Sequence, residues 1–161
     1  MIRKTSDGDE RWLDLDGFAE VEVSRPKRRC TQSSLHCLLR PQTESSWEAA
    51  EPGPQTVRIL FDRPQRIDNV LLEFQEFQLA RTQEFLLRWS SNGGKSYREI
   101  VRQQYNFSPP TTTVEREHYS IDLGDMTNIE LTIIPAADLP AQASPDCAGD
   151  PSTAKWNLTR W

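Results

Sequence analysis

The stretch FLLRWSSNGGKSYREI, residues 85–100, decides the fold. Its first part alternates, so that Phe85, Leu87 and Trp89 fall on one face of an extended strand. The letters SNGG follow. A glycine pair between two strand-like runs predicts a β-hairpin, because glycine accepts the positive φ angles of tight turns. Two antiparallel strands are therefore expected here.

The same period of two recurs on both sides of this hairpin. No segment shows helical spacing of apolar residues for longer than about two turns. Strands are predicted at residues 18–23, 56–61, 67–74, 82–90, 96–105, 116–123, 128–134 and 154–161. About eight strands without helices predict an all-β fold, an antiparallel β-sandwich of the jelly-roll type.

Length and composition describe one domain. A chain of 161 residues can bury one good-sized core, and no linker is long enough to separate two domains. We expect residues 1–11 to form a flexible N-terminal segment and residues 12–161 a single domain. The net charge of −5 is not the basic excess of a nucleic-acid binder. No run reaches the roughly 18 apolar residues that a membrane span needs.

Two features predict a cytoplasmic protein. The first residues, MIRKTSDGDERW, lack the apolar core of a secretory signal. Cys30, Cys37 and Cys147 form an odd count, which would leave a free thiol in an oxidising compartment. A chain from which a leader had been removed would show the same pattern.

Connection lengths predict where a ligand binds. Short connections of about four or five residues are expected at residues 62–66, 92–95 and 124–127. Long connections are expected at residues 24–54, 75–81, 105–112 and 135–152. If successive strands run antiparallel, alternate connections emerge at opposite ends, so every long connection falls at one end. Long loops on a rigid scaffold are typical of binding sites, and this end is the predicted site.

Four segments in this order and spacing also carry a family resemblance. They are ESSWEAAEPGPQTVRILFDRPQRIDNVLLEF at 44–74, FLLRWSSNGGKSYREI at 85–100, YSIDLGDMTNIELTII at 119–134 and KWNLTRW at 155–161. From about Trp12 onward the chain resembles the coagulation-factor C-type (discoidin) domain family. The resemblance implies a galactose-binding-like jelly roll whose loops at one end bind glycans, lipid head groups or proteins.

The sequence departs from this family at its first long loop. Many members hold calcium with an Asp-Gly-containing loop there. Residues 24–46 contain no Asp and only one acid, Glu44, whereas calcium takes about six to eight oxygen ligands. No calcium ion, other metal or cofactor is therefore expected.

The loop RQQYNFSPPTTT, residues 102–113, supplies the main candidate ligand contacts. Tyr105 and Phe107 could offer ring faces to a sugar, while amides offer paired donors and acceptors to its hydroxyls. The candidate amides are Gln103, Gln104 and Asn106. The alternative is that one aromatic ring fills the end of the sandwich and the amides satisfy loop backbone.

Three further candidates lie at the same end: Phe77, Arg81 and Trp47. Arg81 could bind a carboxylate or sulfate through two hydrogen bonds. Its alternative is an ordinary ion pair with Glu76 or Glu84. Trp47 could line the rim of the site, and its alternative is a lid on the core.

Other motifs predict no chemistry. The basic run Arg25–Arg29 is typical of a solvated loop, and contact with an anionic glycan or phosphate backbone is its alternative. Cys30, His36 and Cys37 lack the spacing of a zinc site. The sequence has two histidines and no nucleophile elbow, phosphate-binding glycine loop or His-Glu-x-x-His motif, so no catalytic residue is predicted.

The sequence thus favours a non-catalytic module that recognises a glycan or small polar ligand. The alternative is a protein–protein interaction module of a cytoplasmic assembly, which the odd cysteine count favours. Nucleic acid is the least favoured partner, because the chain is acidic.

Overall fold

The computed structural model describes residue 17, residues 19–23, 54–76 and 80–135, and the backbone of strands 47–48 and 153–159. These residues contain only strands and connections, which confirms the all-β prediction. No helix among them could cross a membrane. The strands are β1 (Ala19–Val23), β2 (Trp47–Glu48), β3 (Gln55–Gln75), β4 (Arg81–Ser90), β5 (Arg98–Phe107), β6 (Val114–Pro135) and β7 (Thr153–Thr159).

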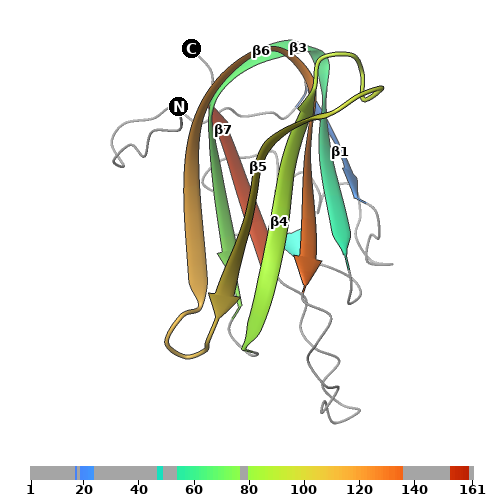
Figure 1. Cartoon of the computed structure of the whole chain (residues 1–161). Helices are drawn as coiled ribbons and strands as arrows, with labels where there is room; N and C mark the ends of the chain where they lie inside the picture. The colour runs from blue at the N-terminus through green and yellow to red at the C-terminus, as the bar shows by residue number, and fades with distance from the viewer. Residues whose placement is uncertain are drawn as a thin grey trace.

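Strands β3 and β6 arch over one end of the molecule and belong to both layers of the sandwich (Figure 1). In one layer, the first part of β3 pairs with β1 and with the last part of β6, followed by β4 and β5. In the other, the last part of β3 pairs with the first part of β6 and with β7, which pairs with β2. All pairs are antiparallel, as predicted.

The structure has arches in place of two predicted turns. Residues 62–66 and 124–127 were expected to separate strands, but β3 and β6 continue through them. The pairing of β3 with β6 shifts register between Leu60 and Asn69. Asp122 and Asp125 have φ angles of 48° and 55°, a left-handed conformation that aspartate tolerates better than most residues. These irregularities bend the strands without ending them.

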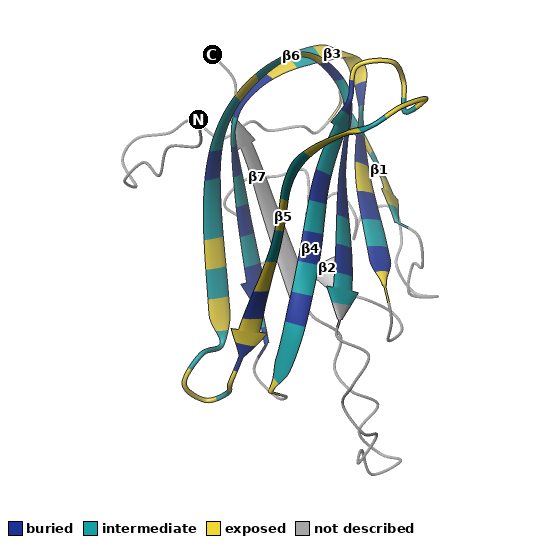
Figure 2. Cartoon of the chain, viewed as in Figure 1, coloured by how far each residue is buried: buried dark blue, intermediate teal, exposed yellow. Residues whose placement is uncertain are grey.

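The core lies between the layers and follows the predicted alternation. Figure 2 shows buried residues alternating with less buried ones along β3, β4 and β6. The buried members of β3 and β4 include Val57, Ile59, Phe61, Leu72, Phe74, Phe85 and Leu87. They are removed from water, at about 25 cal/mol of stabilisation per Å² of apolar surface.

The described connections separate into two poles (Figure 1). The hairpin loop, residues 91–97, lies beside both arches, since Asn128 pairs with Ser90 and with Leu60. We call this end the short-turn pole. At the other end, the long-connection pole, Glu76 N–H donates to the Thr113 carbonyl (2.9 Å), which ties the end of β3 to the loop at 108–113. The predicted separation is confirmed for these connections, while residues 24–46 and 136–152 lie outside the described part.

Candidate binding site

Buried polar side chains gather at the long-connection pole. β3 begins with Gln55, and Glu76 follows its last residue. β4 begins at this pole with Arg81 and Gln83. All four occupy inward positions, in phase with core residues of their own strands, and three of them are almost fully buried. Together with the Tyr105 hydroxyl, we call Gln55, Glu76, Arg81 and Gln83 the polar layer.

Arg81 and Glu76 form an ion pair within this layer. The side chain of Glu76 is 3% exposed and that of Arg81 14% exposed. This is the pairing foreseen as the alternative to an anion-binding role for Arg81, although the pair is buried. Such a pair holds the guanidinium in one orientation.

Gln83 and Tyr105 have spare hydrogen-bonding capacity. They face each other across β4 and β5, in register, and are 0% and 8% exposed. Within the described residues, neither polar atom of the Gln83 amide nor the Tyr105 hydroxyl has a hydrogen-bond partner of good geometry, although the two side chains lie close enough for Gln83 to lower the pKa of Tyr105 through a hydrogen bond. Burial raises the pKa of Tyr105 well above its ordinary value, so this hydroxyl stays protonated. An unmatched buried polar group costs about 1–3 kcal/mol, so these two side chains are the least satisfied part of the polar layer.

The rings of Tyr105 and Phe107 correct a prediction. They were expected in an exposed loop, but both belong to β5 and are buried, Phe107 at 1% exposure. Tyr105 packs 5.2 Å from Phe74, and Phe107 meets Tyr105 edge-on at 5.4 Å. The loop begins only at Ser108. Neither ring offers a free face for stacking, and filling the sandwich end was the alternative.

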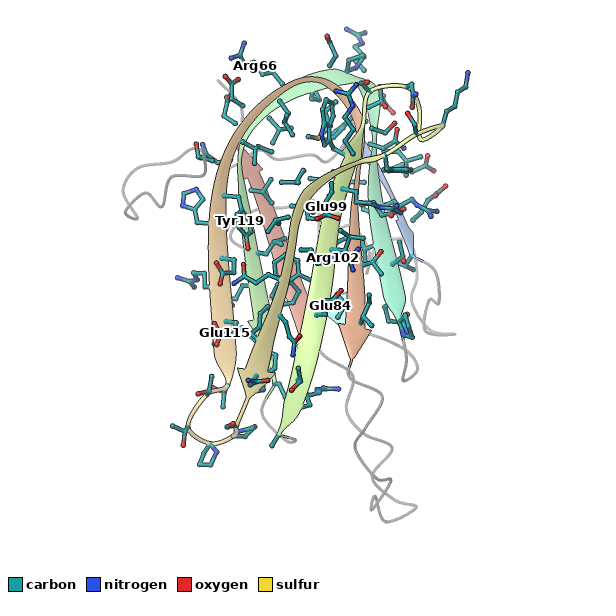
Figure 3. The ribbon with its side chains drawn as sticks, in the orientation of Figure 1. Arg66, Glu84, Glu99, Arg102, Glu115 and Tyr119 are labelled. Atoms are coloured by element: carbon teal, nitrogen blue, oxygen red, sulfur yellow. The ribbon has the colours of Figure 1, made fainter. Side chains whose placement is uncertain are left out.

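The three predicted amides are not brought together, because strand alternation divides them. Gln103 points inward, where it donates to Glu117 Oε1 (2.9 Å) and accepts from the Tyr119 hydroxyl (2.8 Å). These bonds bridge β5 and β6, and Figure 3 shows Tyr119 between the two strands. Gln103 is therefore engaged within the protein.

Gln104 and Asn106 are exposed on the outer face of β5. Asn106 Oδ1 accepts a hydrogen bond from the Thr82 hydroxyl (2.6 Å). Nearby, Arg102 lies 2.6 Å from Glu84 and 3.7 Å from Glu99 on the same face (Figure 3). These two amides could border the site from outside, but they do not join the polar layer.

Several predicted residues lie outside what the structure describes. Trp47 begins β2 and pairs with Ala154, but only its backbone is described. Phe77, the basic run at residues 25–29, and the cysteines and histidine of the rejected zinc site all fall outside the described residues.

Three members of the polar layer escaped sequence reasoning as site residues: Gln55, Glu76 and Gln83. A signal was present, because each continues the inward phase of an apolar series at the point where its strand meets the long-connection pole. The positions of the apolar residues alone do not reveal this signal. Polar residues in an inward phase are the informative exception to burial.

A second polar cluster lies near the short-turn pole. It is on the outer face of the sheet that contains the first part of β3, the last part of β6, and β4. Glu130 is 1% exposed, and its carboxylate accepts from Arg58 Nε (2.6 Å) and from Arg88 Nε (3.0 Å). Burial by itself would raise the pKa of Glu130, but the hydrogen bonds and charges of the two arginines outweigh burial and lower it. We call Arg58, Arg88 and Glu130 the Glu130 cluster. Its carboxylate is fully satisfied, so a structural role accounts for it.

The polar layer offers both hydrogen-bond donors and hydrogen-bond acceptors. Its amides donate and accept, its arginine donates, and its carboxylate accepts, which suits a ligand rich in hydroxyl groups. Within residues 54–76 and 80–135, no group of three His, Cys, Asp or Glu side chains could hold a metal ion.

Known structures share this fold. One is the module CpGH89CBM32-5 of Clostridium perfringens in complex with GalNAc-β-1,3-galactose (TM-score 0.60, 12% identity, covering 93% of this chain and 100% of that chain). Another is the family 32 carbohydrate-binding module of NanJ from the same organism with galactose (0.59, 10%, 93% and 98%). A Ruminococcus gnavus fucosidase with fucose also matches (0.64, 10%, 93%), and there the chain spans only 26% of the enzyme.

Sequence comparisons find neither a matching family model nor a similar curated protein. The structural likeness, at such low identity, concerns the fold alone. The chain has the galactose-binding-like β-sandwich fold of carbohydrate-binding modules.

Proposed function

We propose that this chain is a non-catalytic carbohydrate-binding module that holds a glycan at its long-connection pole. One observation carries the proposal: the fold matches such modules over their full length. The buried Gln83 amide and Tyr105 hydroxyl, which have no well-aligned partner among the described residues, support placing the site at the long-connection pole. The order of the four sequence segments supports placing it as a divergent member of the discoidin family.

The chemistry of the polar layer fits sugar hydroxyls. Each hydroxyl donates one hydrogen bond and accepts others, and the Gln83 amide offers both kinds of partner. The Arg81–Glu76 pair adds fixed donors and acceptors beside it. Ring stacking, if the site uses it, falls to Trp47 or Phe77, since the rings of Tyr105 and Phe107 are buried in the core. Gln104 and Asn106 are proposed as contacts at the border.

A glycan array with three forms of the protein tests this proposal. Wild type is expected to bind at least one glycan. Gln83→Met, which keeps the side-chain volume, should weaken binding about tenfold or more, because a glycan that uncovers the fully buried amide on binding then finds no partner for its hydroxyl. Arg66→Met is the matched control, because Arg66 lies exposed at the short-turn pole and should leave binding unchanged.

Two results would contradict the proposal. One is a folded wild-type protein that binds no glycan, which would favour the protein-interaction alternative. The other is equal weakening by Gln83→Met and Arg66→Met, which would remove the site from the long-connection pole. Thermal unfolding of each variant confirms that it is folded.

A further inference from the structure

The hairpin loop at the short-turn pole contains a chemically reactive pair. Asn92–Gly93 is the sole Asn-Gly dipeptide in the 161 residues. An asparagine before glycine is unusually prone to cyclise, because glycine has no side chain to obstruct the approach of its backbone nitrogen to the asparagine amide. Asparagine is for this reason among the thermolabile residues. Both residues are exposed, so water reaches them.

The attacking nitrogen is held away from the asparagine side chain. Gly93 N–H donates to the Thr127 hydroxyl oxygen (2.9 Å), and that hydroxyl donates to the Ser90 carbonyl (3.1 Å). Thr127 lies at the arch of β6, so the hydrogen bond ties the loop to the sandwich. Attack on the Asn92 side chain requires Gly93 to leave Thr127.

The group under attack is held as well. Asn92 Oδ1 accepts from the Ser90 hydroxyl (2.8 Å) and from Ser96 N–H (3.0 Å). Asn92 Nδ2 donates to the Ser96 hydroxyl (2.8 Å). Ser90 Oγ also accepts from Gly94 N–H (3.0 Å). The side-chain amide is thus fixed by three bonds within the loop.

We propose that Asn92 is a latent deamidation site. In the folded chain, the hydrogen bonds to Thr127 and Ser96 slow its deamidation. When released, the Gly93 nitrogen loses its proton and attacks Asn92 Cγ. A new C–N bond forms, the bond to Nδ2 breaks, and Nδ2 leaves as ammonia, giving a succinimide. Water then opens either carbonyl of the ring, which yields aspartate or isoaspartate. No oxidant or reductant takes part.

Conversion would loosen the loop. In isoaspartate the main chain runs through the former side chain, so the bonds from Asn92 to Ser96 are lost. The loop packs closely on its surroundings at Gly94, where an added Cβ would meet the Tyr97 hydroxyl at 3.0 Å and Asn128 at 3.6 Å. The Arg88 guanidinium lies over the Tyr97 ring, 5.0 Å from its centre. A loosened loop would therefore withdraw the Tyr97 ring from Arg88, a member of the Glu130 cluster.

The test compares ammonia release and isoaspartate content in folded protein incubated at mildly alkaline pH. Thr127→Val removes the acceptor for Gly93 and should deamidate about three- to tenfold faster than wild type, the factor expected from one lost hydrogen bond. Thr127→Ser keeps a hydroxyl and should match wild type. Asn92→Gln should release no extra ammonia, which assigns the signal to this residue.

Ser96→Ala provides a second route, because it frees Asn92 Nδ2 and leaves Thr127 in place. It should also accelerate deamidation, so the proposal remains testable if Thr127→Val does not fold. Hydrogen exchange should then quicken at Tyr97 and Asn128 in the converted protein. The proposal is overturned if folded Thr127→Val and Ser96→Ala deamidate at the wild-type rate, or if folded wild type reacts as fast as urea-unfolded chain.

Discussion

The two poles of the sandwich treat their polar groups in opposite ways. At the short-turn pole, Ser90, Asn92, Ser96 and Thr127 satisfy one another through hydrogen bonds of normal length. At the long-connection pole, Gln83 and the Tyr105 hydroxyl are buried with no partner among the described residues other than each other. The polar groups of the short-turn pole stabilise the fold, whereas those of the long-connection pole retain some hydrogen-bonding capacity. This difference is the reason for placing the proposed glycan site at the long-connection pole.

The largest effect on the free energy of unfolding is expected at the Glu130 cluster, whose polar groups have hydrogen-bond partners. Glu130→Ala leaves Arg58 and Arg88 without their carboxylate, and breaking a buried pair costs about 3–5 kcal/mol. Because these arginine side chains are 44% and 37% exposed, we expect a smaller loss, about 2 kcal/mol in the free energy of unfolding, measured by urea denaturation. Glu99→Ala, at an exposed position on the same face, should change stability by less than about 0.5 kcal/mol. Equal losses would show that burial of Glu130 is unimportant.

Two glutamines give the sharpest comparison. Gln103 has both a donor and an acceptor bond, so Gln103→Met should lower the free energy of unfolding by about 1 kcal/mol. Gln83 has no well-aligned bond among the described residues and only the Tyr105 hydroxyl beside it, so Gln83→Met should leave the free energy of unfolding unchanged or slightly higher while weakening glycan binding. Denaturant unfolding and the glycan array measure the two quantities. Destabilisation by Gln83→Met equal to that by Gln103→Met would mean that the Gln83 amide is satisfied in solution.

Two tyrosines repeat the comparison on a smaller scale. Tyr119→Phe removes the hydrogen bond to Gln103 and should cost about 0.5–1 kcal/mol in the free energy of unfolding. Tyr105→Phe removes an unmatched hydroxyl and should leave stability unchanged or slightly higher. Both changes keep the ring, so packing is constant. The reverse order of stability would contradict the assignment of spare capacity to the long-connection pole.

The smallest expected effect is the pH-dependent part of the Glu130 cluster. The folded-state pKa of Glu130 lies below its ordinary value of 4.5, so the unfolded chain binds a proton more readily. Its contribution is complete above that ordinary value and is lost as pH falls through the lower folded-state pKa. Urea denaturation across acidic pH should therefore show a steeper decline for wild type than for Glu130→Gln. Parallel declines would indicate that the carboxyl has its ordinary pKa when folded.

Sequence alternation predicted much of this fold and little of the site. It placed Val57, Phe85 and Leu87 inward, and the glycine pair at 93–94 fixed the hairpin, because both signals are local. It failed at residues 62–66, where proline and charged residues are typical of a turn, while pairing with β6 carries β3 onward. That pairing links residues far apart in sequence, so no local pattern reports it.

The assignment of Tyr105 to Phe107 to a loop was wrong for a related reason. Tyr105 to Phe107 precede a proline-rich loop and were assigned to it, but pairing with Arg81 to Gln83 extends β5 to Phe107. Once β5 includes these residues, alternation alone would have put Tyr105 and Phe107 inward with Gln103, and Gln104 and Asn106 outward. The end of a strand depends on its neighbour as much as on its own residues.

The passage of β3 and β6 through both layers has a mechanical consequence. In a sandwich whose strands each belong to a single sheet, the halves can separate while the sheets stay intact. Here two chain segments are shared, so pulling the layers apart would tear hydrogen-bonded rows in each of them at once. The two layers should therefore resist force and proteolysis as one unit.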